Sequence, residues 1–148
     1  MEKVHDKEDF YKIYDWAGAD RNKLPWAHDE PTLFLRDIIA QHDKPGKALD
    51  IGCGTGTDSL YLAGKGWDVT SLDFMPAALE MTHSRAATAG LELITIEADV
   101  TEWEPTDKFD LVLDHGLLHN MNPDRYPLYR ERVMQAIADD GEFLILHW

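Results

Sequence analysis

The chain has 148 residues, of which 44% are hydrophobic and 28% are charged, and its formal net charge is −14. This length suits one domain with a sizeable core and is short for two. The acidity and the lack of a Lys/Arg cluster disfavour nucleic acid as a partner, because phosphate binding depends on such clusters.

Neither a membrane protein nor a secreted protein is expected. No apolar run approaches the roughly 20 residues that cross a bilayer, and residues 1–12 are charged throughout, without the apolar centre of a secretory signal. Cys53 is the single cysteine, which excludes an intrachain disulfide. These features predict a cytoplasmic protein.

Two short helices are predicted in the N-terminal third of the chain. Residues 7–16 place Phe10, Ile13 and Tyr14 at helical spacing. After a loop, Pro31 is expected in the first turn of a second helix, whose apolar positions continue to residue 39.

From residue 47 onward, apolar strands alternate with helices. The expected strands are 47–51, 67–73, 91–99, 109–116 and 142–148, and the expected helices are 57–63, 76–90 and about 124–138. Strands joined through helices pair in parallel by right-handed crossovers. The sequence therefore predicts an α/β fold, a doubly wound, Rossmann-like and mostly parallel sheet of about five strands, with its ligand beyond the strands' carboxyl ends.

Three alternating glycines follow the first strand. Asp50 ends this strand, and Gly52, Gly54 and Gly56 come directly after it. Glycine permits a sharp turn and lets a ligand touch the backbone. The G-x-G-x-x-G pattern of dinucleotide sites is absent, because the third glycine comes one position early. Asp73 ends the next strand, where a carboxylate can accept both ribose hydroxyls. The pattern therefore favours a nucleoside without a pyrophosphate.

Several segments carry a family resemblance. "LDIGCGTG" (49–56), "VTSLDF" (69–74), "EADV" (97–100) and "FDLVLDHGLLHNM" (109–121) resemble the motifs of class I S-adenosylmethionine-dependent methyltransferases, and the likeness covers residues 46–148. "LPWAHDEP" (24–31) and the residues after Gly116 are similar to the small-molecule branch, near the thiopurine, thiol, halide and tellurite methyltransferases.

The resemblance implies S-adenosylmethionine as cofactor and S-adenosylhomocysteine as product. Each expected role is carried over by position. Asp50 and the backbone of Gly52, Cys53, Gly54 and Gly56 would hold the methionine part, Asp73 the ribose, Phe74 the adenine ring, and Asp99 and Val100 the adenine edge, while Asp114 and His115 would border the sulfonium.

The chemistry of transfer leaves the role of the histidines open. A soft anion such as a thiolate needs no base, whereas an alcohol or amine can require one. His115, His119 and Asp114 are the candidate catalytic residues, and His147 ends the last expected strand. The three imidazoles could supply a base, bind a metal ion or line the site; polar lining is favoured and no metal is predicted.

Residues 1–45 are expected to form a helical lid on a core of residues 46–148, within one domain. Trp16, Trp26, Tyr11 and Tyr14 offer broad surfaces that could close over the site, and His147 is expected beside the substrate. The alternative is that these aromatic residues only pack the first helices onto the sheet.

The last strand is expected to form an open, apolar edge. In the class I methyltransferases that this sequence resembles, an antiparallel hairpin of two strands follows, which is absent here. Two explanations stay open: the chain is a fragment, or its exposed edge pairs with a second copy to form a homodimer. The expected function is methyl transfer to a small molecule, with a soft nucleophile as one candidate acceptor. The alternatives are a cofactor-binding module without activity and an enzyme that cleaves the cofactor.

Overall fold

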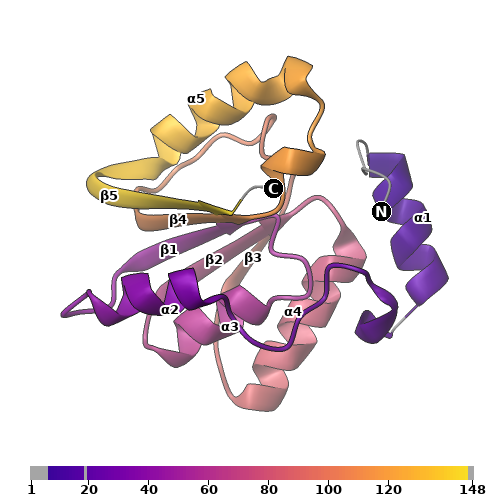
Figure 1. Cartoon of the computed structure of the whole chain (residues 1–148), viewed down its shortest axis with the longest axis horizontal. Coiled ribbons are helices and arrows are strands. Elements are labelled where there is room, and N and C mark those ends of the chain that lie inside the picture. Colours follow the sequence, from indigo (N-terminus) through magenta and orange to yellow (C-terminus); the bar gives the residue numbers. More distant parts are fainter. Residues whose placement is uncertain (1–6, 19, 147–148) are drawn as a thin grey trace.

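A computed structural model describes residues 7–18 and 20–146, in which five parallel strands form one sheet of order β3-β2-β1-β4-β5 (Figure 1). The strands are β1 (Lys47–Ile51), β2 (Asp68–Asp73), β3 (Ile94–Glu97), β4 (Phe109–His115) and β5 (Ile137–Leu146). The predicted doubly wound, Rossmann-like sheet is confirmed.

The strand order reverses at β1, which pairs with β2 on one side and with β4 on the other. Ile51 lies opposite both Leu72 and Asp114, so the carboxyl ends of these three strands meet at one edge of the sheet. Ligands of open α/β sheets bind beyond such a reversal point. The fold therefore directs the site to the segments that follow β1, β2 and β4.

Helices cover both faces of the sheet. Figure 1 shows α5 (Tyr126–Ala136) on one side and α2 (Leu33–Ala40), α3 (Thr57–Gly64) and α4 (Pro76–Ala89) on the other. Leu49 packs in the cluster that contains Val133 of α5, whereas Ala48 packs with Leu62 of α3. Alternate residues of β1 thus face opposite layers, and both faces are apolar because neither meets water.

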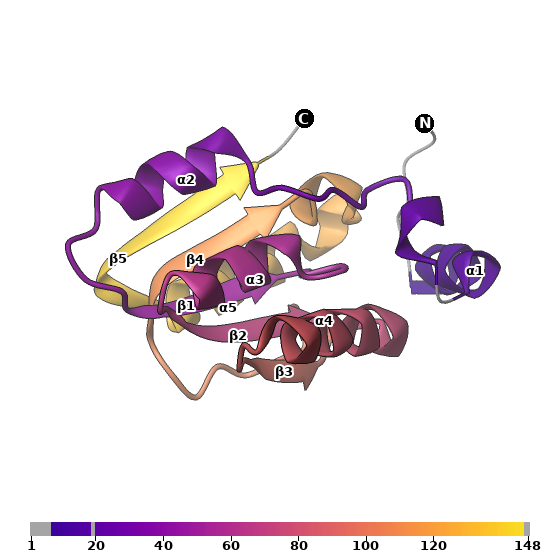
Figure 2. The same ribbon diagram turned by 90° about the horizontal axis from the view of Figure 1, so that it is seen from below.

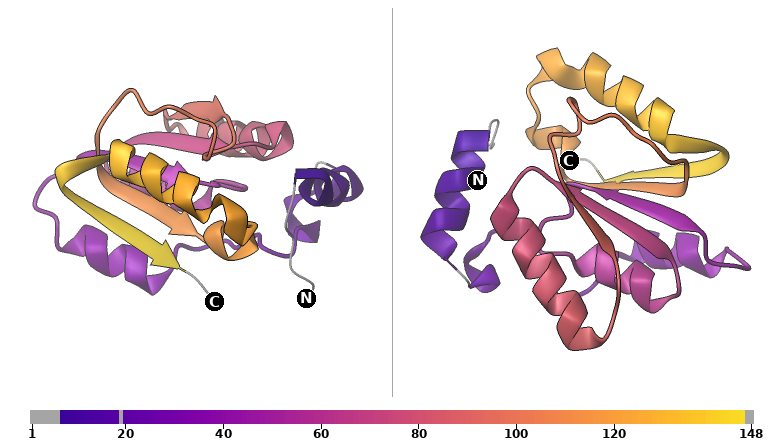
Figure 3. Two further views of the ribbon diagram at one scale, coloured as in Figure 1. Left: turned by 90° about the horizontal axis from the view of Figure 1, so that it is seen from above. Right: turned by 180° about the vertical axis from the view of Figure 1, so that it is seen from behind.

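Helix α1 (Lys7–Ala17) lies apart from these layers, beyond the carboxyl ends of the strands (Figures 2 and 3). Its buried residue Tyr14 clusters with Leu24 and with Met75 and Ala78 of the α4 region. The predicted helix at 7–16 is thereby confirmed, and it is attached to the molecule at the edge where the site is expected.

The start of α2 differs from the prediction. Pro31 is not in its first turn, because Thr32 is the N-cap and its hydroxyl accepts a hydrogen bond from the Leu35 N–H. A threonine cap requires an extended backbone before the helix, which leaves Pro31 outside.

The boundary between α5 and β5 also differs. The helix begins at Tyr126, after a short 3-10 turn (Pro123–Arg125), and β5 begins at Ile137 instead of residue 142. Two steps along β4, from Phe109 to Leu111, correspond to five along β5, from Ile137 to Glu142. The residues between the predicted helix and the predicted strand, 139–141, therefore lie within β5 and form an irregularity in its pairing with β4.

No helix in the described part of the chain has both the length and the apolar character needed to cross a membrane.

Gly56 is a glycine of the site edge whose replacement should be costly. It caps α3 with φ 90°, and an added Cβ would lie 2.7 Å from Cγ2 and Oγ1 of Thr82. We expect Gly56→Ala to lower the free energy of unfolding by about 1–3 kcal/mol, measured by urea denaturation. Gly64→Ala is the control, because a Cβ there meets open space. Equal effects of the two substitutions would contradict the prediction.

Candidate functional site

Two adjoining cavities open where β1, β2 and β4 end; the first has a volume of about 550 Å³ and the second of about 540 Å³. Both are lined by Gly52, Asp73, Phe74 and Phe10, so these residues form the boundary between the two spaces. The glycine loop and the Asp73 carboxylate at the end of β2, which the sequence predicted to act together, lie side by side.

The glycine loop, residues 52–56, is folded back onto β2. The N–H groups of Gly52 and Cys53 donate to the carbonyl oxygen of Leu72, at 2.7 and 3.0 Å. Gly52 and Gly54 have φ of 69° and 57°, in the left-handed region that favours glycine. The carboxylate of Asp73 accepts the Gly54 N–H at 3.0 Å. The loop backbone is therefore fixed against the carboxylate beside it.

Two buried carboxyls in this edge have raised pKa values. Burial raises the pKa of Asp73 to about 6, although the N–H groups of Met75 and Gly54 favour its charged form. Burial and the nearby charge of Asp58 raise the pKa of Asp50 to about 8, against the hydrogen bond that Ser59 donates at 2.6 Å. At neutral pH Asp50 is therefore mostly protonated, whereas Asp73 is mostly ionised and can accept hydrogen bonds from a ligand.

The first cavity contains the residues that the sequence assigned to an adenine ring. Phe74, Asp99 and Val100 line it. Asp99 accepts hydrogen bonds from the N–H and hydroxyl of Thr101, at 2.9 and 2.7 Å, and the Lys7 ammonium lies 3.6 Å away. Burial alone would raise the pKa of Asp99, but these donors and the nearby cations hold it below its ordinary value.

Aromatic residues of the N-terminal third cover the boundary between the cavities. The Phe10 ring meets the rings of Phe74 and Trp26 edge-on, with centroids 5.3 and 5.5 Å apart. Tyr14 and Trp26, two of the residues expected in the lid, line the second cavity. Trp16 is 67% exposed and, like Tyr11, is not among the described residues that line either cavity. His147 lies outside the described residues.

Asp114 is not brought to the cavities, contrary to its predicted position beside the sulfonium. It is fully buried and accepts hydrogen bonds from the N–H groups of Leu117 and Leu118, at 2.7 and 3.2 Å, and from the Tyr129 hydroxyl. Its oxygens thus connect β4 to the following turn and to α5, and it lines neither cavity among the described residues.

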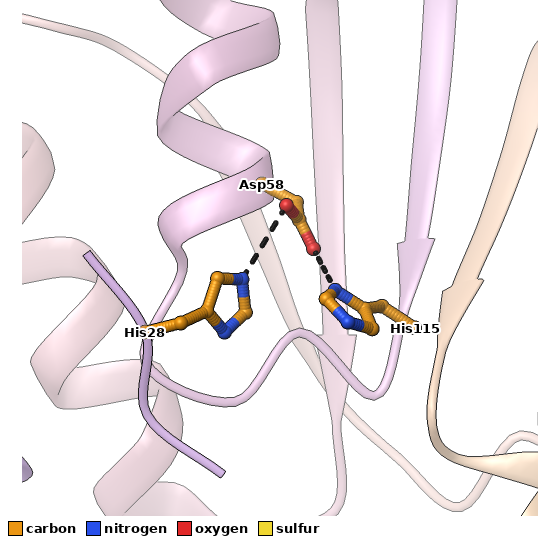
Figure 4. Close-up of side chains that lie close together, drawn as sticks. All are labelled: His28, Asp58 and His115. Carbon is orange, nitrogen blue, oxygen red and sulfur yellow. Dashed lines mark hydrogen bonds and ion pairs between the residues drawn. The ribbon is translucent and has the colours of Figure 1, made fainter. Parts of the chain in front are cut away.

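The second cavity holds a cluster of three polar side chains from three segments (Figure 4). His115 ends β4, Asp58 lies in the first turn of α3, and His28 lies in the loop before α2. The distance from His115 Nδ1 to Asp58 Oδ2 is 2.8 Å, and that from His28 Nε2 to Asp58 Oδ1 is 3.6 Å. His119 lines the same cavity. We call His28, Asp58 and His115 the His–Asp–His cluster.

Contacts within the cluster alter its acid–base properties. Burial alone would raise the pKa of Asp58, but its contacts with His115 and His28 hold that pKa below the ordinary value. The Asp58 contact raises the pKa of His28, against the effect of partial burial. Asp58 is therefore a carboxylate at neutral pH.

The loop that carries His28 is attached to the start of α3. The carbonyl oxygen of His28 accepts hydrogen bonds from the Thr57 hydroxyl and from Arg21 Nη2, the latter at 2.8 Å. Arg85 Nη1 donates to Thr57 Oγ1 at 3.0 Å and to the carbonyl of Thr55 at 2.7 Å. These bonds fix the position of His28 over the start of α3.

Sequence reasoning missed His28 and Asp58. Asp58 could have been found, because it lies two residues after the last glycine of the loop, at the sheet edge already chosen for the site. His28 gave no such indication, since nothing in the sequence places a loop residue against a helix that begins 29 positions later.

The comparisons with known proteins agree with this geometry. Residues 48–141 match a family described as a methyltransferase domain. The chain belongs to this methyltransferase family. Its similarity to thiol and thiocyanate methyltransferases and to TehB confirms the predicted resemblance to the small-molecule branch of the class I S-adenosylmethionine-dependent enzymes.

Three similar proteins illustrate the range of the methyltransferase family. A 2-heptyl-1-hydroxyquinolin-4(1H)-one methyltransferase of Mycobacteroides abscessus is 30% identical over 124 residues, 82% of this chain and 55% of that protein. Probable thiol methyltransferase 2 of Arabidopsis thaliana is 30% identical over 133 residues, covering 88% and 57%. A structure titled "Conversion of a Disulfide Bond into a Thioacetal Group during Echinomycin Biosynthesis" has a TM-score of 0.80 and 32% identity, covering 93% and 60%. The chain thus spans about half the length of these curated relatives.

Proposed function

We propose that this chain transfers a methyl group from S-adenosylmethionine to a small-molecule acceptor. The observation that carries the proposal is the contact between the glycine loop and Asp73, at the boundary of two cavities in a methyltransferase fold. A nucleoside donor fits this arrangement because bare backbone and a carboxylate face the same space.

The cofactor would extend through both cavities. Its adenine would occupy the space beside Phe74, Asp99 and Val100, and its ribose would bind Asp73. Its methionine part would follow the glycine loop towards Asp50, where a bound cationic group would lower the raised pKa and stabilise the carboxylate. The sulfonium would then face the His–Asp–His cluster.

The acceptor would bind among the polar side chains of the second cavity, which include His28, His115, His119 and Asn120. Methyl transfer from a sulfonium is an in-line displacement, and oriented proximity alone contributes roughly 7–11 kcal/mol to such reactions. The names of two relatives specify a 1-hydroxyquinolinone and a thiol acceptor, and for this chain we propose an acceptor with an O–H or S–H group.

The N-terminal segment would act as the lid of this site, through Phe10, Tyr14 and Trp26. A cytoplasmic location is supported by a single cysteine, which is buried, free and reduced. The acidity supports small molecules as ligands in preference to nucleic acid.

Cofactor binding tests the first step. We expect calorimetry to detect S-adenosylmethionine binding whose affinity falls up to about tenfold per pH unit below pH 6, because free Asp73 is protonated there and must ionise to accept the ribose hydroxyls. Asp73→Asn should weaken binding roughly tenfold to 100-fold at pH 7.5 and lose the part of the pH dependence centred near 6.

Asp110→Asn is the matched control, because this carboxylate lies at the opposite end of β4 and accepts the Lys47 N–H at 2.9 Å. Its affinity for the cofactor should equal that of the wild type. Binding that is unchanged by Asp73→Asn in a folded variant would remove Asp73 from the site.

Transfer itself is tested with cofactor carrying a labelled methyl group and a panel of thiols, N-hydroxy heteroaromatics and halides. We expect label in at least one thiol or hydroxyl acceptor and formation of S-adenosylhomocysteine in equal amount. Tight cofactor binding without transfer to any acceptor would contradict the proposed methyl transfer and favour the module without activity or, if the cofactor is broken down, an enzyme that cleaves it.

Pairing of two copies through β5 is a further part of the proposal. β5 is an edge strand, and its Phe143 and Ile145 are 38% and 37% exposed. We expect sedimentation equilibrium to show a dimer for the wild type and a monomer for Ile145→Lys. A charged side chain on an edge strand opposes pairing with another strand. Ile94→Lys, on the edge strand β3, should leave the dimer intact. A wild-type monomer at high concentration would refute the pairing.

A further inference from the structure

The His–Asp–His cluster contains two buried polar atoms that face each other without a hydrogen bond. His28 Nε2 and Asp58 Oδ1 are both buried and have no hydrogen-bond partner within the described part of the chain. They are 3.6 Å apart, which is too long for a good hydrogen bond. The Asp58 side chain is only 7% exposed, so water has little access to these atoms.

The other nitrogen of His28 determines which tautomer is present. Nδ1 lies 3.2 Å from the carbonyl oxygen of Trp26, and a carbonyl can only accept, so Nδ1 carries a proton. In the neutral imidazole, Nε2 then presents a lone pair towards a carboxylate oxygen. Two lone pairs at this distance require a positive charge between them.

The side chains supply the donor set of a transition-metal site. One ligand atom each from His28, Asp58 and His115 lies within 4.8 Å of the other two. Two ligands of a tetrahedral zinc ion are about 3.3 Å apart, given metal–ligand distances of roughly 2.0–2.1 Å, so the side chains would move closer together around the ion. His115 Nδ1 carries a proton towards the Asp58 carboxylate at 2.8 Å, and metal binding through this nitrogen would release that proton. The Trp26 carbonyl orients the His28 ring as an outer partner of a metal-bound histidine does.

We propose that His28, Asp58 and His115 bind a divalent transition-metal ion, with Zn²⁺ as the best match to two imidazoles and one carboxylate. This site differs from the one considered from the sequence, which combined His115 with His119 and His147 and was not favoured. The ligands come from three segments that meet only in the fold. With neutral imidazoles the cluster carries one negative charge, which attracts a divalent cation and would leave the occupied site with a net charge of +1.

The open coordination position would face the second cavity, which all three ligands line. A thiol or hydroxyl acceptor bound there would lose its proton to solvent, because a metal ion lowers the pKa of a bound acid strongly. The acceptor anion would attack the methyl carbon as the carbon–sulfonium bond breaks, leaving its electron pair on sulfur. This catalytic role depends on the proposed function, whereas metal binding does not.

Metal binding is tested on the full chain after dialysis against a chelator. We expect calorimetry with Zn²⁺ to give one site per chain, and Co²⁺ to give the visible absorption of a tetrahedral complex with nitrogen and oxygen ligands. Asp58→Asn and His28→Gln should each weaken Zn²⁺ binding by at least about 10–100-fold, the effect of losing even an outer partner. His83→Gln, on the exposed face of α4, should bind as the wild type does.

Circular dichroism and urea denaturation of each variant separate loss of the site from loss of the fold. The proposal would be overturned if the wild type had no saturable Zn²⁺ site, or if folded His28→Gln and Asp58→Asn bound Zn²⁺ as tightly as the wild type does. A protonated His28 paired with Asp58 would then explain the cluster. Titration of the same samples with S-adenosylmethionine keeps the outcomes distinct. Cofactor binding without Zn²⁺ binding refutes the metal site alone, and the reverse refutes the proposed cofactor.

Discussion

The turn after β1 is the constraint on which the site depends. Its N–H groups at Gly52 and Cys53 share one acceptor, the carbonyl oxygen of Leu72 at the end of β2. This sharing draws the chain across the sheet edge and leaves the next N–H, at Gly54, to the Asp73 carboxylate. The resulting left-handed backbone at Gly52 and Gly54 favours glycine, which has no Cβ. These two bare positions leave the backbone of the turn open to the cavities that it lines.

A second set of contacts joins the N-terminal third to this turn. The carbonyl of His28 is held by Thr57 and Arg21, while Arg85 reaches the same threonine from α4. The His–Asp–His cluster is therefore a junction of the loop before α2, the start of α3 and the end of β4, with Asp58 between two imidazoles. The His28 ring is oriented by the Trp26 carbonyl outside the cluster, and the His115 ring by Asp58 within it.

Sequence alone was sufficient for the sheet and the glycine turn, because apolar runs and glycine spacing are local properties. It failed where a position depends on packing. Asp114 lies near the end of its strand, as expected, but its oxygens accept hydrogen bonds from two backbone N–H groups and from the Tyr129 hydroxyl. β5 starts early because an irregularity absorbs the residues expected to form a turn. His28 escaped prediction because its neighbour belongs to a distant helix.

The buried carboxyls at this edge have a consequence for the donor proposed above. Burial is the main cause that raises the pKa of Asp50, and the charges of Asp58, Asp114 and Asp73 add to it. A cation bound beside these groups would oppose their mutual repulsion and lower that pKa. In the proposed reaction the donor carries a sulfonium charge that the spent nucleoside lacks, so the spent nucleoside would be the weaker competitor for the same space.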